Sequence, residues 1–391
     1  MQATRIASRA GTLTYKSNLV CAAQQQNHWV RTASKFVARR SAGTMAARLA
    51  DNVPDKMTAV LLDKPVENAE DLGKFVRDDI DVPGKSKPLG PREVLVRNKY
   101  CGVNFIDTYF RSGLYPKPLP TGLGQEGAGE VVGKGEEVTD DMCRIGDTVV
   151  YMGHPTYAEY AAANINTVSA VPEDVPLEDL LTLSIQGLTA HYLAMDTYPL
   201  GKGKTCLIHA AAGGTGQLLV QIAKLLGAET VIGTCSKAKV DIAKNAGCDL
   251  VLPYDELDHE EMIKRVKEAT GGEGVHVVYD GVGKSTYQMS MKCIRSRGML
   301  VIFGNSSGAT PPIDPLDLTS NGCIFLTRPS LYGYIKTHED YQRGMSDLVN
   351  WYKEGKLKVN VQKVFPFKEA GQAHKFIESG KTTGKLLLAF D

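Results

Sequence analysis

The chain lacks a charge excess of either sign: 45 Lys and Arg face 44 Asp and Glu, a formal net charge of +1 over 391 residues. A protein built to wrap nucleic acid carries a clear basic excess, so nucleic acid is not an expected partner. No two of the eight cysteines form a Cys-x-x-Cys pair. This argues against a zinc ribbon or a disulfide framework and favours free, buried thiols in a reducing compartment.

An uninterrupted apolar stretch is also lacking. Residues 205–223 carry no charge, but they contain three glycines, two glutamines and a histidine, so they are too polar to span a membrane. What the chain does have is the composition of a globular protein, with 43% hydrophobic and 23% charged residues. Its 39 glycines follow no period, which indicates tight turns and close backbone approaches.

Acidic residues are absent from residues 1–50, where eight Lys and Arg stand among many Ser, Thr and Ala. Such a segment is typical of a mitochondrial transit peptide, and it lacks the apolar core of a secretory signal. The alternative is a basic tail, or sequence missing from the working protein, because Met45 and Met57 are both plausible starts. We expect residues 1–56 to be a transit-like or disordered basic segment and the protein to reach the mitochondrial matrix, with the cytoplasm as the alternative. The chain after residue 50 has 37 basic and 44 acidic residues, a net of −7.

Two kinds of pattern divide the chain after residue 56. Up to about residue 180, short alternating strands bounded by Gly and Asp are typical of an antiparallel barrel. From there on, apolar strands alternate with amphipathic helices, which predicts βαβ units and a parallel sheet. The expected strands are 205–209, 230–234, 249–252, 275–279 and 299–303, and the expected helices are 216–227, 237–246, 259–269 and 286–296.

The segment 205–227 carries the central motif. A buried strand runs into Gly213-Gly214-Thr215-Gly216, which opens an amphipathic helix, and a second strand follows. In a dinucleotide site the glycines let the backbone approach the pyrophosphate, and the helix N-terminus supplies free N–H groups. The motif therefore predicts a Rossmann dinucleotide-binding domain, the alternative being a tight strand–helix turn without a ligand.

The end of the second strand bears on the choice of cofactor. NAD enzymes place an acidic residue there for the ribose 2′-hydroxyl. This chain has Thr234-Cys-Ser-Lys-Ala-Lys239, with no acid, one serine and two lysines. Cations and hydroxyl donors suit a 2′-phosphate, so the sequence favours NADPH. The alternative is that the lysines only solvate the start of the next helix.

Residues 103–115, Val-Asn-Phe-Ile-Asp-Thr-Tyr-Phe-Arg-Ser-Gly-Leu-Tyr, resemble the signature of the zeta-crystallin-like quinone oxidoreductases of the medium-chain dehydrogenase/reductase superfamily. Further similar motifs follow in family order from about residue 57 to the end of the chain, at 122–129, 187–190, 211–216, 279–283, 303–308 and 327–331.

The resemblance implies an α/β protein with a GroES-like β-barrel catalytic domain and a Rossmann NADPH-binding domain. The catalytic domain would span 57–180, the Rossmann domain 181–330, and residues 331–391 would return to the catalytic domain. Family members are typically homo-oligomers, so a homodimer is expected, with 327–330 helping the edge of the Rossmann sheet to pair with its twin. The stretch 66–87 is longer than in bacterial members and is read as a surface insertion.

The resemblance also indicates a site without metal. In the zinc alcohol dehydrogenases of this superfamily a Cys and a His bind the catalytic zinc, and the matching positions here are Asn104 and Gln125, neither a competent ligand. The four-cysteine structural zinc lobe is missing too. Without a Lewis acid to polarise a carbonyl, the expected acceptor is already electrophilic, such as a quinone or a conjugated enone. The expected activity is a zinc-independent NADPH-dependent quinone oxidoreductase.

The resemblance implies roles for fifteen residues. Tyr hydroxyls and an Asn amide would face the acceptor as hydrogen-bond or proton donors, and the expected catalytic residues are Asn104, Tyr109 and Tyr115. The expected cofactor-binding residues are Thr189, Gly213, Gly214, Thr215, Gly216, Ser236, Lys239, Tyr254, Phe303, Gly304, Asn305 and Ser330. Each tyrosine taken alone is more often a packing residue with its hydroxyl satisfied, and His154, His191 and His209 are assigned structural roles.

Two rival functions stay open. One keeps the fold and changes the substrate, namely a mitochondrial 2-enoyl-thioester reductase, whose proton-donating tyrosine falls at Tyr115. The other is a non-catalytic, crystallin-like or RNA-binding relative, against which the acidic balance after residue 50 and the intact cofactor motifs both argue.

Overall fold

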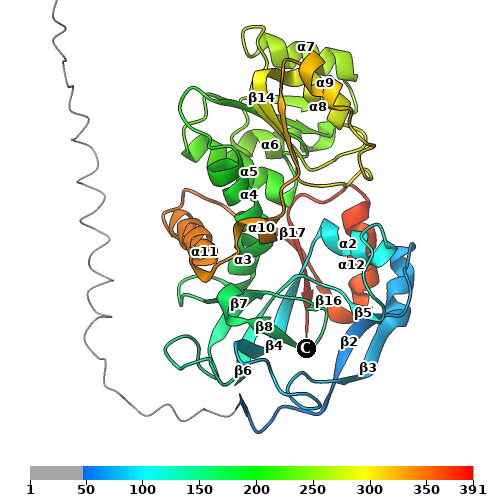
Figure 1. Ribbon diagram of the computed structural model, residues 1–391, viewed down its shortest axis with the longest axis vertical. Coiled ribbons are helices and arrows are strands. Elements are labelled where there is room, and N and C mark those ends of the chain that lie inside the picture. Colours follow the sequence, from blue (N-terminus) through cyan, green and yellow to red (C-terminus); the bar gives the residue numbers. More distant parts are fainter. Residues whose placement is uncertain (1–46, 391) are drawn as a thin grey trace, which may run out of the picture. The chain divides into compact units, whose positions relative to one another are not determined.

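Residues 47–390 are described by the computed structural model, and their strands form three sheets (Figure 1). One sheet has eight strands, one has six and one has three. The eight-stranded and six-stranded sheets belong to the two domains that the sequence predicts, a barrel-type domain and a Rossmann domain. The expected α/β class is therefore confirmed, while the exact domain boundaries stay predictions.

The six-stranded sheet is parallel throughout, in the order β12-β11-β10-β13-β14-β15. This is the strand order of a Rossmann fold, in which ligands bind at the carboxyl ends of the strands near the point where the order reverses. That point is the junction of β10 with β13. The strands are β10 (Thr205–Ile208), β11 (Thr230–Cys235), β12 (Leu250–Pro253), β13 (Val275–Asp280), β14 (Ile294–Ile302) and β15 (Phe325–Thr327).

Helices cover the faces of this sheet. They are α5 (Gly214–Leu225), α6 (Val240–Ala246) with the preceding 3₁₀ turn η5 (Lys237–Lys239), α7 (His259–Glu268), α8 (Tyr287–Cys293) and α9 (Pro315–Ser320). The expected helix at 286–296 is too long, because it ends at Cys293 and β14 begins at once. Ile294 pairs with Val275 ahead of a register shift. Residues 294–296, which the helical pattern predicts as helix, therefore belong to an irregular start of the strand.

The eight-stranded sheet is built from both ends of the folded chain. Its main path is β16-β17-β4-β6-β7-β9, with β1 paired to β6 and β8 to β4. The last strand, β17 (Lys385–Ala389), lies antiparallel to β4 (Glu93–Val103), so the C-terminal segment returns to the first domain. The other strands are β1 (Arg48–Leu49), β6 (Glu126–Lys134), β7 (Thr148–Met152), β8 (Tyr160–Asn164), β9 (Val168–Ala170) and β16 (Val361–Pro366).

Strand pairing begins before residue 57. β1 pairs with Lys134 and Gly133 of β6, and Val53 is buried. The leading segment of the sequence analysis therefore contributes residues 47–56 to the fold, and its remainder lies outside the described residues. This pairing is possible because residue 133 is glycine. A Cβ at Gly133 would lie 2.5 Å from the side chain of Leu49, which packs there.

The insertion at 66–87 is anchored to the helix that carries the family signature, α2 (Phe105–Ser112). It forms the 3₁₀ helix η1 (Ala69–Phe75) and β3 (Val76–Asp81), which pairs with β2 (Lys56–Leu62) in the three-stranded sheet with β5 (Thr121–Gly122). The buried guanidinium of Arg111 donates to the carbonyls of Val66 and Glu67 and to the Glu378 carboxylate of α12 (Ala370–Glu378).

A long helical stretch joins the two sheets. It consists of α3 (Leu177–Thr182), η3 (Leu183–Gly187), α4 (Leu188–Tyr192) and η4 (Leu193–Thr197), where η3 and η4 are π-helical turns. Beside it lie α10 (Leu331–Tyr334) and α11 (His338–Lys353) (Figure 1). No helix within residues 47–390 is long and apolar enough to cross a membrane. The seven cysteines in that range form no disulfide, and six of them are buried.

A fully buried ion pair lies where the barrel sheet meets this helical stretch. Lys385 on β17 contacts Glu126 on β6, and both side chains have no exposed surface. The second carboxylate oxygen of Glu126 accepts the backbone N–H of Ile185 at 2.9 Å. Gly102 of β4 makes room for the pair, because a Cβ there would lie 2.2 Å from Glu126 Oε1.

We expect Lys385→Met to destabilise the protein by about 3–5 kcal/mol, because it leaves the Glu126 carboxylate buried and unpaired. Thermal and chemical denaturation would measure this loss. The double variant Lys385→Met, Glu126→Gln should recover part of it. Lys56→Met removes a pair of which both side chains are about half exposed and is the control, which should change the stability far less than Lys385→Met does. A single variant as stable as the parent would contradict the prediction.

Candidate active site

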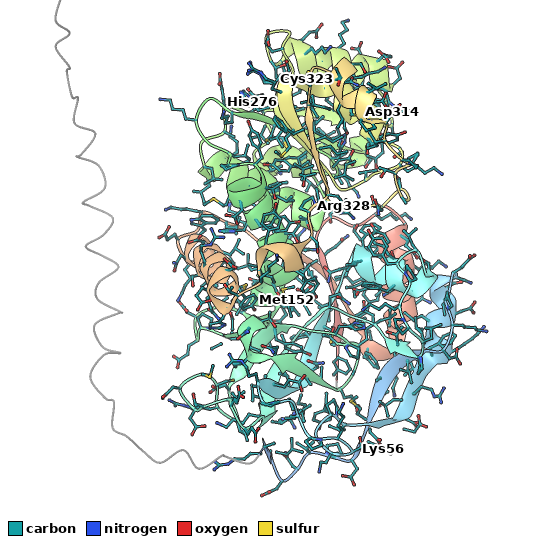
Figure 2. All side chains as sticks on the ribbon, in the orientation of Figure 1. Lys56, Met152, His276, Asp314, Cys323 and Arg328 are labelled. Atoms are coloured by element: carbon teal, nitrogen blue, oxygen red, sulfur yellow. The ribbon has the colours of Figure 1, made fainter. Side chains whose placement is uncertain are left out.

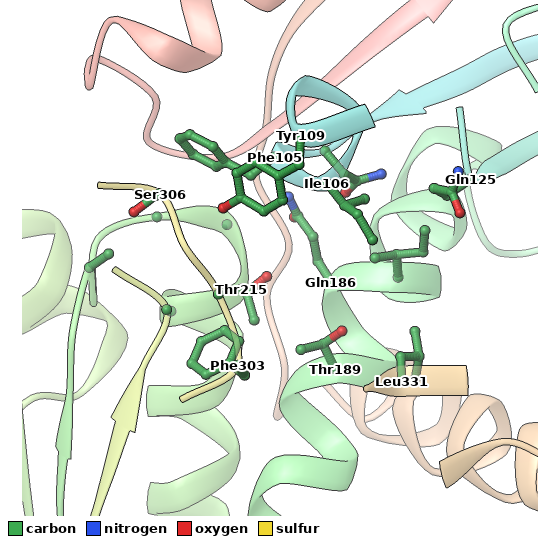
Figure 3. Close-up of a pocket in the computed structure, with 18 of the residues that line it drawn as sticks. Phe105, Ile106, Tyr109, Gln125, Gln186, Thr189, Thr215, Phe303, Ser306 and Leu331 are labelled. Carbon is green, nitrogen blue, oxygen red and sulfur yellow. The ribbon is translucent and has the colours of Figure 1, made fainter. Parts of the chain in front are cut away.

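A cavity of about 310 Å³ lies between the carboxyl edge of the Rossmann sheet and α2 (Figure 3). Phe105, Ile106 and Tyr109 of α2 form one wall, and the glycine loop with Phe303 after β14 forms another. The helical stretch 185–189 forms a third. Most of the lining is apolar or aromatic, as in small-molecule sites that admit few polar contacts.

Eleven of the fifteen predicted site residues line this cavity. They are Asn104, Tyr109, Tyr115, Thr189, Gly213, Gly214, Thr215, Gly216, Phe303, Gly304 and Ser330. The structure therefore brings together segments that lie more than two hundred residues apart. The four others, Ser236, Lys239, Tyr254 and Asn305, lie outside its lining.

The glycine loop has the geometry that a dinucleotide requires. Gly213 is the N-cap of α5 and no side chain caps that helix, so the N–H groups of the first turn are open to an anion. Gly216 packs against the turn that follows β10, since a Cβ there would lie 2.2 Å from the carbonyl oxygen of Ala210. Gly281 leaves space for the ring of Phe303, which a Cβ would approach to 2.9 Å.

Ser236, Lys239 and Tyr254 gather at the end of β11 instead. The side chain of Ser236 caps nothing, and Tyr254 is 54% exposed beside it, with its backbone N–H on the carbonyl of Cys235. Lys239 Nζ donates to the carbonyls of Gly380, at 2.5 Å, and Thr382, at 2.8 Å. Partial burial lowers the pKa of Lys239. Lys237, by contrast, is exposed and paired with Glu256.

A polar cluster joins α2 and the residues after it to the segments that follow β14 and β15. The hydroxyl of Tyr115 accepts from Asn305 Nδ2 at 2.8 Å and from Arg328 Nη2 at 2.9 Å. The backbone N–H of Asn305 donates to the hydroxyl of Tyr109 at 3.1 Å. Asn305 thus touches the site through both tyrosines although it does not line the cavity. Arg328, labelled in Figure 2, lies at the junction of the two domains; it is the one cation among the lining residues, apart from histidine.

Asn104 is held in one orientation. Its Oδ1 accepts from Lys385 Nζ at 3.0 Å and its Nδ2 donates to Glu126 Oε1 at 2.8 Å. Because an ammonium group only donates and a carboxylate only accepts, the amide cannot flip. Gln125, the other position tested for zinc, contacts His154 Nδ1 at 3.0 Å and accepts from the Tyr332 hydroxyl at 3.2 Å.

Behind α2 lies a buried chain of titratable groups. Asp107 Oδ2 accepts from the backbone N–H of Asn104 at 2.9 Å and from the Tyr157 hydroxyl at 3.3 Å. The Tyr157 hydroxyl also contacts His374. The other carboxylate oxygen of Asp107, Oδ1, has no partner. Burial raises the pKa of Asp107 to about 7, against the opposing effects of the Asn104 N–H and the Lys385 charge. Burial lowers the pKa of His374 to about 3, so this ring is neutral.

Sequence reasoning missed several lining residues, among them Gln186, Arg328, Thr382 and Gly384. Arg328 stands in a quoted motif, but it was assigned to the sheet edge, and its charge inside a quinone-type motif is the signal that could have been used. Gln186 precedes the motif at 187–190 directly. Thr382 and Gly384 follow no motif and are brought in by β17.

Two family models match the chain. "Alcohol dehydrogenase GroES-like domain" matches residues 90–202, and "Zinc-binding dehydrogenase" matches residues 214–351. Among curated proteins, "Quinone oxidoreductase" of Pseudomonas aeruginosa is 40% identical over 76% of this chain and 91% of its own length. "Quinone oxidoreductase 1" of Escherichia coli is 42% identical over 76% and 90%. "2-haloacrylate reductase" of a Burkholderia species is 40% identical over 76% and 91%.

Solved structures agree. The Escherichia coli quinone oxidoreductase complexed with NADPH has a TM-score of 0.78 and 37% identity, and the match covers 85% of this chain and all of that one. A mycobacterial protein complexed with NADPH has a TM-score of 0.79 and 38% identity with the same coverage.

We expect Asp107→Asn to change how stability depends on pH. The folded state raises the pKa of Asp107 from 3.8 to about 7, so it binds this proton more tightly than the unfolded chain does. The resulting stabilisation is fully present below about pH 4 and is lost as the pH rises through about 7. As the pH rises across this window the parent should lose stability that the variant never had. The free energy of unfolding of the variant should therefore increase relative to that of the parent, as denaturant titrations at several pH values would show. Asp78→Asn, at an exposed position, should run parallel to the parent, and a parallel course for Asp107→Asn would refute the assignment.

Proposed function

The chain belongs to the quinone oxidoreductases of the medium-chain dehydrogenase/reductase superfamily, and on this premise we propose that it uses NADPH to reduce a quinone or a related conjugated carbonyl. The observation that carries the proposal is the meeting, in one cavity, of an uncapped glycine loop with the hydroxyls of Tyr109 and Tyr115. Bound NADPH would supply the hydride. The protein would supply position, hydrogen bonds and exclusion of water.

The residues present fit this cofactor. The open N-terminus of α5 and the close approaches at Gly214 and Gly216 suit a pyrophosphate. No acid ends β11, and Ser236 and Lys239 stand there instead. Within the described part of the chain Lys239 forms no ion pair with a carboxylate, and its present partners are neutral carbonyls. We propose that Ser236 and Lys239 hold the 2′-phosphate, with Tyr254 beside the adenosine and Thr189, Phe303, Gly304 and Ser330 at the nicotinamide end.

The acceptor would lie against Asn104, Tyr109 and Tyr115. Both lone-pair positions of the Tyr115 hydroxyl are taken by Asn305 and Arg328, so its own proton is free to be donated to the acceptor oxygen as that atom gains charge. Arg328 would stabilise the negative charge left on the phenol oxygen. Asn104, fixed by Lys385 and Glu126, presents an amide of defined orientation.

The donor set at this site does not suit zinc. Asn104 and Gln125 offer amides instead of a thiolate and an imidazole. The Lys385 ammonium already lies 3.0 Å from the Asn104 oxygen, where a second cation would be repelled. The acceptor must therefore be polarised by hydrogen bonds alone, which favours quinones and enones over simple aldehydes.

The test is oxidation of NADPH against a panel of ortho-quinones, para-quinones, enals and crotonyl thioesters. We expect quinones to be turned over fastest, because the relatives of 40–42% identity include quinone oxidoreductases. Crotonyl-thioester turnover above quinone turnover would favour a 2-enoyl-thioester reductase instead. Absence of turnover together with a salt-sensitive RNA complex would favour the non-catalytic alternative.

We expect Lys239→Ala to raise the Michaelis constant for NADPH by about tenfold or more and to leave NADH nearly unaffected, because the variant loses a charge-assisted bond to the 2′-phosphate alone. Steady-state kinetics with both cofactors would measure it. Lys237→Ala, which removes an exposed cation two residues away, is the control and should change neither constant. If Lys239 only holds η5 against the carbonyls of Gly380 and Thr382, the Michaelis constants for NADPH and NADH will rise equally.

We also propose a homodimer formed through β15, the edge strand of the Rossmann sheet. Phe325 on β15 is 59% exposed and Leu316 on the neighbouring α9 is 72% exposed, so the edge carries apolar side chains beside unpaired backbone groups. Sedimentation of the intact protein as a monomer at micromolar concentration would contradict this.

The mitochondrial address is proposed from composition alone, on the eight basic and no acidic residues in 1–50. A reporter fused to residues 1–56 that stays outside mitochondria would contradict it.

A further inference from the structure

Gln186 carries an unpartnered oxygen at the cavity. Six side-chain oxygens within residues 47–390 are buried without a hydrogen-bond partner, and they belong to Asp107, Thr156, Ser184, Gln186, Thr197 and Tyr341. Of these residues only Gln186 lines the large cavity. A buried acceptor without a partner destabilises the folded state, because it has lost its hydrogen bonds to water. Its position at a cavity therefore indicates that a ligand group supplies the missing donor.

The local backbone directs the side chain of Gln186 into the cavity. Gln186 lies on the π-helical turn η3, a form of helix that is frequent at functional sites. The N–H of Ile185 in this turn donates to Glu126 Oε2, which holds the turn against β6. From there the side chain of Gln186 extends into the cavity toward Tyr109 and Thr215 (Figure 3).

The glycine loop is shaped to receive the amide. A Cβ at Gly214 would lie 2.4 Å from Gln186 Oε1 and 2.5 Å from Nε2, so only glycine leaves room for the side chain there. Gly214 is the first residue of α5, at the open helix end. The carboxamide therefore lies against the part of the loop that a pyrophosphate would approach.

We propose that Gln186 is a cofactor-positioning residue that binds the nicotinamide half of NADPH, an inference that rests on the proposed function. Phosphate oxygens have no proton to give at neutral pH, so the donor for Oε1 is an O–H or N–H group of the nicotinamide riboside. Nε2, which forms no hydrogen bond within the described residues, donates to an oxygen of the phosphate on the nicotinamide side, which 2′,5′-ADP lacks. A primary amide serves both because it holds a donor and an acceptor side by side.

A structural water is the competing explanation. A second cavity of about 10 Å³ is also lined by Gln186 and Gly214, together with Gln217 and Asn360. It has room for one water at most. Such a water would satisfy Oε1 whether or not the nicotinamide half is present, and this difference separates the two explanations.

The experiment measures binding directly, by fluorescence titration with NADPH and by calorimetry with 2′,5′-ADP, which lacks the nicotinamide half. Gln186→Met keeps the length of the side chain and removes both polar atoms. It should raise the dissociation constant for NADPH by about tenfold and leave that for 2′,5′-ADP unchanged. Gln186→Glu keeps an acceptor but adds charge beside phosphate, and it should weaken NADPH binding at least as much.

Gln221→Met is the matched control, because Gln221 is on the same helix as Gly214 and donates only to the carbonyls of Gln217 and Lys358. It should change neither constant. Unchanged NADPH affinity in Gln186→Met would overturn the proposal, and so would an equal loss for both ligands, which a structural water or a distorted loop would give. Failure of the parent protein to bind NADPH at all would instead overturn the proposed function.

Discussion

The arrangement of the site depends on one buried interaction, the contact of Lys385 with Glu126. It joins the last strand of the chain to β6, with neither side chain exposed, and so encloses two full charges inside the barrel domain. Such a pair is stable only when its remaining donors and acceptors are also satisfied. Here Asn104 and the N–H of Ile185 satisfy them. Both belong to walls of the cavity, so the pair fixes the start of α2 and the π turn η3 relative to each other.

The same dependence explains which parts of the site the sequence could predict. The glycine loop is local: strand, turn and helix follow within about twenty residues, and their chemistry is visible in the residue types. Tyr109 and Tyr115 were found through a motif around α2. Gln186, Arg328 and Thr382 escaped because their relevance arises from contacts between distant segments, such as Arg328 with Tyr115 across 213 positions. The fold followed the same rule, since the parallel sheet was predictable from its period and the boundary between α8 and β14 was set by a register shift.

The charged groups near the cavity are arranged so that no carboxylate lines it. Asp107 and Glu126 lie close behind the cavity, yet neither lines it. Glu126 is paired with Lys385, and burial raises the pKa of Asp107 to about 7, which reduces its negative charge near neutral pH. The side chains that do line the cavity include a single Arg and no carboxylate. A field of this sign favours both an anionic cofactor and an acceptor oxygen that becomes negative during reduction.

The ion pair also bears on the chemistry. In a metal-dependent dehydrogenase the first position of the signature supplies a thiolate, whereas here it is an amide whose oxygen accepts from an ammonium group. Replacing Asn104 by Cys alone would therefore not restore a zinc site, because Lys385 would remain beside it and repel the ion. Removing Lys385 would in turn leave Glu126 unpaired and weaken the barrel. Stability and reaction class are thus coupled through one residue, so this scaffold is committed to acceptors that need no Lewis acid.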